Sequence, residues 1–314
     1  MTSDLSTLTR GDRDDVVVRA RGVSKRYGIV AALRDLDMDV YRGECICILG
    51  PNGAGKTTMV ELMEGFRAPD SGTIEVLGVN PAKARSGWRE RIGVVSQHHE
   101  SIPGRTVWET VEYWATLYRA SRDPAEVLTT VGLEHKARAK GHSLSGGLRR
   151  RLEFALAIIG RPELLFLDEP TAGLDPISRR AFWQLIGQLK DAGTTIVLCT
   201  HYLDEAAWLG DRLIVMVAGR MMAAASPDKL GAEHRVDSLV RWSEDGKVHE
   251  QRTDDPASLV VKLAQQANRA VEGLEVIPPT LEDAYFRLVG SHQGAESPSD
   301  GINLGQEQGG GSNT

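Results

Sequence analysis

The chain has 314 residues, of which 41% are hydrophobic and 25% charged, so it can bury a sizeable core and disorder of the whole chain is excluded. Its net charge is −6, from 37 lysines and arginines against 43 aspartates and glutamates, and it has no long basic block, which argues against a nucleic-acid binder driven by charge. No apolar run approaches the roughly 18 residues of a membrane span, so we expect a cytoplasmic protein.

The first elements predict the opening of a nucleotide-binding α/β fold. Residues 1–15 are polar and are expected to be frayed, and strand-like patterns begin at Val16. The short apolar run 44–50 (ECICILG) is typical of a central strand that is buried on both faces. A glycine-rich loop follows it, and then a helical pattern whose predicted buried face is Met59, Leu62, Met63 and Phe66.

The middle of the chain, about 98–150, is predicted to be a helical insertion. Thr106 and Glu109 are spaced as a capping box, and Asp123 followed by Pro124 opens a second helix. Strand patterns return at 163–170 and 194–201, separated by a helix around 179–190. Alternating strands and helices of this kind predict a doubly wound parallel sheet.

The sequence pattern changes again after residue 225. Short strand patterns and a helical pattern predict a small α+β appendage over 226–290. It ends in a helix that starts with Thr280 and Asp283 spaced as a capping box, and its predicted packed face is Leu281, Tyr285, Phe286 and Leu288. Residues 291–314 contain no aromatic residue and are expected to be a disordered tail.

The glycine-rich loop between Gly50 and Thr57 matches the pattern G-x-x-x-x-G-K-[ST]. Its glycines let backbone N–H groups point at phosphate oxygens, and the helix that follows adds its positive end. Lys56 is expected to reach the β- and γ-phosphates, and the Thr57 hydroxyl to bind Mg²⁺. A strand precedes the loop and a helix follows it, and this context distinguishes the motif from a chance glycine-rich turn.

A second apolar strand, 164–167, ends in the carboxylates Asp168 and Glu169. Ligands of open α/β sheets bind at the carboxyl ends of the strands, so Asp168 is predicted to hold Mg²⁺ through water and Glu169 to act as general base on the attacking water. The segment LSGG, 144–147, lies before a helix and forms a second possible anion site. The three arginines at 149–151 are expected to form a partly solvated face.

The order of these motifs resembles that of the ATP-binding subunits of ABC transporters, over about residues 16–225. GPNGAGKT resembles the Walker A motif, LLFLDE the Walker B motif, LSGG the signature and GLDP the D-loop. The resemblance implies that Tyr27 stacks on adenine, that Gln97 is the Q-loop glutamine and that His201 is the switch histidine that contacts the γ-phosphate. The implied ATP-binding residues are Tyr27, Gly50, Pro51, Asn52, Gly53, Ala54, Gly55, Lys56, Thr57 and Thr58. Catalysis is assigned to Lys56, Gln97, Glu169 and His201, Mg²⁺ binding to Thr57, Gln97 and Asp168, the signature to Leu144, Ser145, Gly146 and Gly147, and the D-loop to Leu174 and Asp175.

The same resemblance implies a fold and an assembly. The fold is a P-loop α/β core with an ABC-type parallel sheet, an antiparallel β subdomain and a helical subdomain at about 98–150. Two copies bind two ATP molecules head to tail, the phosphate loop of one copy facing the signature of the other. Such a dimer is expected to bind MgATP, no nucleic acid, and a separate membrane-spanning permease at the inner face of the cell membrane.

One position departs from the usual family pattern, in which glutamine follows the signature glycines, whereas this chain has Leu148. This variant and the C-terminal segment resemble the drug and antibiotic exporter branch, which includes proteins of the daunorubicin-resistance type. The alternatives are an importer ATPase and a non-transport ABC ATPase acting on ribosomes or DNA. A purely regulatory role is disfavoured because Glu169 and His201 are both present.

Two minor patterns suggest metal binding only weakly. His98 and His99 are adjacent, but no third ligand stands at helical or strand spacing, so they are interpreted as surface loop residues. The three cysteines lie in strand-like runs without C-x-x-C spacing and are predicted to be reduced, buried thiols.

Overall fold

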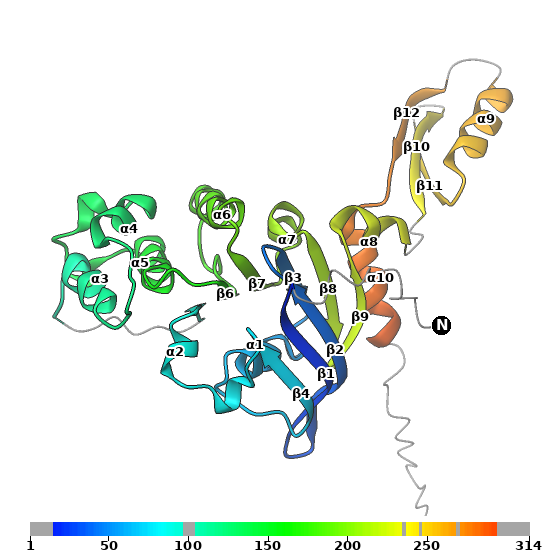
Figure 1. The fold of residues 1–314 in the computed structure, drawn as a ribbon. Helices are drawn as coiled ribbons and strands as arrows, with labels where there is room; N and C mark the ends of the chain where they lie inside the picture. Colours follow the sequence, from blue (N-terminus) through cyan, green and yellow to red (C-terminus); the bar gives the residue numbers. More distant parts are fainter. Residues whose placement is uncertain (1–14, 97–103, 234–236, 245–246, 268–270, 294–314) are drawn as a thin grey trace, which may run out of the picture.

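The computed structural model describes residues 15–96, 104–233, 237–244, 247–267 and 271–293 (Figure 1). Gln97, His98 and His99 lie outside these described residues, as do the two ends predicted to be frayed or disordered, apart from Asp15 and residues 291–293. The prediction of a disordered tail is wrong for residues 291–293, which continue the last helix. Within the described residues, no helix combines the length and the apolar character needed to cross a membrane.

A six-stranded sheet forms the centre of the molecule, in the order β5-β6-β7-β3-β8-β9. All neighbours are parallel except β9, which runs antiparallel to β8. The strands are β3 (Cys45–Leu49), β5 (Ile92–Val95), β6 (Leu164–Asp168), β7 (Thr195–Thr200), β8 (Arg212–Val217) and β9 (Arg220–Ala225). The predicted doubly wound parallel sheet is thus confirmed, and burial on both faces explains why its strands are almost wholly apolar.

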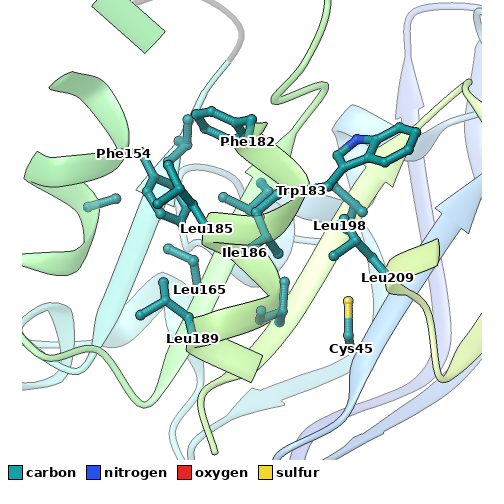
Figure 2. Close-up of a cluster of buried hydrophobic side chains, with 14 of the residues drawn as sticks. Cys45, Phe154, Leu165, Phe182, Trp183, Leu185, Ile186, Leu189, Leu198 and Leu209 are labelled. Atoms are coloured by element: carbon teal, nitrogen blue, oxygen red, sulfur yellow. The ribbon is translucent and has the colours of Figure 1, made fainter. Parts of the chain in front are cut away.

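Successive residues of each central strand belong to two different cores. In β3, Cys45, Cys47 and Leu49 pack on one face and Ile46 and Ile48 on the other. The first face is covered by α5 (Gly146–Ile158), α6 (Pro176–Asp191) and α7 (Leu203–Leu209). Figure 2 shows the apolar side chains of α6 packed against this face, with Phe182 meeting Phe154 at a ring-centroid distance of 5.0 Å. All three cysteines are buried and free, as predicted.

The opposite face carries α1 (Lys56–Met63) and a three-stranded antiparallel sheet in the order β2-β1-β4. Its strands are β1 (Val16–Tyr27), β2 (Val30–Tyr41) and β4 (Ser71–Val76), and a one-turn helix α2 (Ser86–Arg89) leads back to β5. The predicted helical face at the end of α1 is wrong in one residue: Gly65, at φ 79°, follows the helix end, and Phe66 is 72% exposed.

The predicted helical insertion contains α3 (Val107–Ala115), α4 (Pro124–Thr130) and the start of α5. Both helices begin as predicted. Thr106 and Glu109 form a capping box at the start of α3. Asp123 is the N-cap residue of α4, which begins at Pro124, and its side chain accepts from the N–H of Ala125. Figure 1 shows these helices at the end of the central sheet farthest from β9.

The C-terminal part combines a small sheet with three helices. The sheet has the order β11-β10-β12 and is formed by β10 (Ser238–Glu244), β11 (Lys247–Thr253) and β12 (Glu272–Ile277), with α9 (Pro256–Ala267) against it. Helices α8 (Pro227–Glu233) and α10 (Leu281–Gln293) pack beside β9 and β8, and the small sheet projects beyond them (Figure 1). Thr280 and Asp283 form the predicted capping box: Thr280 Oγ1 accepts from the N–H of Asp283, and the Asp283 carboxylate accepts from the N–H of Thr280. Phe286 is 61% exposed, so it does not belong to the packed face.

Candidate active site

The phosphate-binding loop connects β3 to α1 and needs glycine for close packing. A Cβ atom on Gly50 would lie 2.4 Å from the carbonyl oxygen of Met216 in β8, and one on Gly55 would lie 2.4 Å from that of Ala32 in β2. Gly55 also has φ 99°, in the left-handed region, where it caps α1. The loop is therefore pressed between two sheets, and its N–H groups are set at the N-terminus of a helix.

Lys56 and Thr57 are the first two residues of α1 and follow this loop directly. Lys56 is buried, and its Nζ donates to the carbonyl oxygens of Gly50 (2.8 Å) and Pro51 (3.3 Å). The Thr57 hydroxyl donates to Asp168 Oδ2 across 3.2 Å, which joins the loop to the end of β6. The motif residues on β3, α1 and β6 thus converge although more than a hundred positions separate them.

Asp168 has the features of a ligand for a hard cation. Its Oδ1 is buried without a hydrogen-bond partner among the described residues, and burial raises the pKa of the carboxyl above its ordinary value. A buried, unpartnered carboxylate oxygen is costly unless a cation or water completes it. One hydroxyl and one carboxylate are the kind of sparse protein donor set that Mg²⁺ uses together with phosphates and water. Thr57 and Asp168 therefore fit a Mg²⁺ ion bound with a nucleotide.

Glu169 and His201 meet at the carboxyl ends of β6 and β7. Glu169 Oε2 lies 2.6 Å from His201 Nδ1, and the Glu169 side chain is 10% exposed against 44% for His201. The backbone of Glu169 has φ 49°, which is uncommon for a residue with a side chain. Its N–H donates to the carbonyl of Cys199, so the turn is tied to β7. The arrangement places a carboxylate and an imidazole side by side.

A cavity of about 500 Å³ joins the loop to this carboxylate. It is lined by Val30, Ala32, Asn52, Gly53, Ala54, Gly55, Lys56, Thr57, Thr58 and Glu169. Tyr27 is not among these residues, but it pairs with Val30 across the β1–β2 turn and is 39% exposed. The Arg67 guanidinium lies 5.3 Å from the centre of its ring. Tyr27 thus stands beside the cavity rather than in it.

The signature and the D-loop lie close to each other and do not line that cavity. Ser145 is the N-cap residue of α5, with its Oγ 3.5 Å from the N–H of Leu148, and the preceding Leu144 is buried. Asp175 caps α6 by accepting from the N–H groups of Ile177 and Ser178. A Cβ on Gly147 would lie 3.7 Å from Leu174. No signature or D-loop residue lines the 500 Å³ cavity.

Arg150 is a residue whose place in this site was not anticipated. Arg149 is exposed, as expected, but the Arg150 side chain is 11% exposed and donates to main-chain carbonyls at the end of β6. In the sequence, its inward position is indicated only by the run of three consecutive arginines in a helix that packs against the core.

These features define a P-loop nucleoside triphosphatase: a phosphate-binding loop connects a strand of the parallel sheet to a helix, and a threonine–aspartate pair lies beside the loop. The family described as "ABC transporter" matches residues 33–172. The chain is 39% identical to the Nod factor export ATP-binding protein I of Rhizobium etli, over 85% of this chain and 92% of that one. It is 36% identical to a daunorubicin resistance ATP-binding protein of Streptomyces coeruleorubidus, over 88% and 97% of the two chains.

Solved structures agree with the sequence relatives. An ATP-binding subunit of an ABC transporter is similar with a TM-score of 0.63 and 26% identity, over 69% of this chain and 92% of that one. A dimeric ATP-binding cassette in a post-hydrolysis state with ADP and Pi is similar with a TM-score of 0.61 and 28% identity, over 67% and 98%. The chain belongs to the ABC transporter family as an ATP-binding, ATP-hydrolysing subunit.

Proposed function

We propose that this chain drives an exporter, binding MgATP in a head-to-tail dimer and acting through a separate membrane-spanning subunit at the inner face of the cell membrane. The observation that carries the dimer is that no residue of the LSGG segment lines the 500 Å³ cavity of its own chain. The N-terminus of α5 is exposed, and its Gly146 N–H and helix dipole favour the binding of an anion. It is not part of the phosphate site of the same chain. A second copy turned head to tail supplies the missing partner at both sites.

Each residue has a role in this proposal that follows from its position. The loop amides and Lys56 hold the phosphates, while Thr57 and Asp168 hold Mg²⁺, which supplies charge compensation to the phosphate oxygens. Glu169 accepts the proton of the attacking water, and His201 orients that carboxylate through the 2.6 Å contact. Gln97, for which the structure provides no geometry, keeps its proposed role at the Mg²⁺ and the attacking water.

Export is proposed from the relatives, whose names specify Nod factor export and daunorubicin resistance. These two names support a drug, an antibiotic or a lipid-like molecule as the proposed class of substrate. In this proposal the membrane subunit contains the substrate pocket and determines the choice among them.

Liposome reconstitution tests the proposal. The chain alone should hydrolyse MgATP and move no cargo, whereas vesicles that also contain its co-purifying membrane protein should move a fluorescent lipophilic drug away from the side that carries this chain. A complex made with Lys56→Ala is the control, because it lacks the phosphate-binding cation. Cargo movement by the chain alone, or movement toward the ATPase side, would contradict the proposal.

A further inference from the structure

The guanidinium of Arg150 uses all five of its N–H donors. Arg150 lies in the second turn of α5, five residues after the signature serine. Its Nε donates to the carbonyl of Pro170 (2.8 Å), Nη1 to the carbonyl of Ser96 (2.6 Å) and to the Glu153 carboxylate (2.8 Å), and Nη2 to the carbonyls of Asp168 (3.0 Å) and Glu169 (3.1 Å). Five satisfied donors match the full hydrogen-bonding capacity of an arginine.

Three of these acceptors are consecutive carbonyls at the end of β6, from Asp168 to Pro170. This is the turn in which Glu169 has φ 49°. A left-handed backbone conformation is unfavourable for a residue other than glycine and persists only where its surroundings hold it. The Arg150 guanidinium and the hydrogen bond from Glu169 N–H to the Cys199 carbonyl stabilise this turn.

We propose that Arg150 is a positioning residue for ATP hydrolysis, which holds the 168–170 peptide so that the Glu169 carboxylate faces the phosphate cavity and His201. The inference rests on the role of general base proposed for Glu169. Arg150 touches no reacting atom in this arrangement, since its partners are main-chain carbonyls and Glu153.

The fork geometry makes this a role for arginine rather than for any cation. A lysine has three donors on a single nitrogen, so it leaves at least two of the five acceptors without a partner. It keeps the positive charge, however, so a lysine variant separates the geometric role from a purely electrostatic one. Glu153, itself 13% exposed, compensates the charge in either case.

Arg150→Lys is therefore the main variant, and Arg151→Lys is its matched control. Arg151 lies on the same helix and donates to the carbonyl of Val131, away from the cavity. We expect Arg150→Lys to lower kcat about 10–100-fold, the size of effect that a small misplacement of a catalytic group produces, with the Kd for ATP changed less than twofold. Arg151→Lys should leave both values unchanged. A wild-type kcat for Arg150→Lys would overturn the proposal.

A double variant distinguishes positioning from general damage. If Arg150 acts through Glu169, then Arg150→Lys/Glu169→Gln should hydrolyse ATP at the rate of Glu169→Gln alone, because the base that Arg150 positions is already gone. Losses that multiply would overturn the proposal. A wild-type rate for Glu169→Gln alone would instead refute the role of Glu169, so the two failures are distinguishable.

A thermal melt checks that Arg150→Lys is folded. If it is not, Glu153→Gln replaces it, since this change weakens one of the five contacts and leaves the carbonyls in place. Glu153→Gln should then lower kcat a few-fold at an unchanged Kd for ATP, and an unchanged kcat would overturn the proposal.

Discussion

Replacing Glu169 by glutamine removes a base from the active site and keeps the length and planar end of the side chain. The carboxylate lines the phosphate cavity and lies 2.6 Å from His201 Nδ1. An amide at this position still carries an oxygen that accepts a hydrogen bond, but it cannot take a proton from water. Glu169→Gln therefore tests general-base catalysis with little change in packing.

The expected loss can be stated as a rate and as a free energy. Removing a general base slows a reaction about 10²–10⁴-fold, which raises the activation free energy by about 2.7–5.4 kcal/mol. ATP binding should persist, because the loop amides, Lys56 and the Thr57–Asp168 pair remain. Loss of a negative charge beside the γ-phosphate favours binding further, so the variant should accumulate as an ATP-bound dimer.

Phosphate release measures the rate, a fluorescent ATP analogue the Kd, and size-exclusion chromatography with MgATP the dimer. Glu163→Gln is the matched control: it removes a carboxylate just before the opposite end of β6, where Glu163 pairs with Arg91 at 2.5 Å and Arg42 at 3.2 Å. It should hydrolyse ATP normally. A Glu169→Gln protein with the wild-type rate would refute the assigned role and leave the end of β6 a structural feature.

Three further predictions concern the loop, a buried carboxyl and the signature. Gly50→Ala should weaken ATP binding and cost about 1–3 kcal/mol of stability in chemical denaturation, because its Cβ would lie 2.4 Å from the Met216 carbonyl oxygen, whereas Gly87→Ala, in open space, should cost neither. Burial raises the pKa of Glu64 from 4.5 to about 8, so the folded protein keeps a proton that the unfolded chain loses and stability falls between pH 4.5 and 8. Glu64→Gln removes this loss, which is at most about 5 kcal/mol. Its melting temperature relative to wild type should therefore rise from pH 5 to pH 9, and a constant difference would contradict the raised pKa of Glu64. Ser145→Ala should leave ATP binding by the monomer intact and weaken ATP-driven dimerisation in size-exclusion chromatography, and a normal dimer would contradict the role of the signature.

Much of the fold and the phosphate-binding half of the site could be predicted because local sequence determines them directly. The apolar run of β3, the glycines of the loop and the lysine at the start of α1 are contiguous, and their geometry follows from strand and helix rules. One error came where a helical spacing was extended too far. Phe66 follows Met63 at helical spacing, but Gly65 with φ 79° comes after the helix end, and periodicity alone does not detect that end.

Other elements had no comparable local pattern. Strand β12 (Glu272–Ile277) was not predicted, because three of its six residues are glutamate or glycine, which are uncommon in strands. It pairs with β10, whose partner residues lie 29 to 38 positions earlier, so the pairing and not its own sequence stabilises it.

Arg150 could have been recognised only by combining the arginine triplet with the fold. Successive helix residues are rotated by about 100°, so three of them sweep about 200° around the axis. Helix α5 packs against α3 on one side and against β5 on another, which leaves too little solvent-facing surface for three arginines in a row. At least one guanidinium must then turn inward, and there it needs acceptors. The carboxyl ends of parallel strands expose carbonyls that no strand partner uses, and the end of β6 supplies three of them to Arg150. Since these acceptors lie 18 to 20 residues away in sequence, only the packing of α5 beside the sheet identifies them.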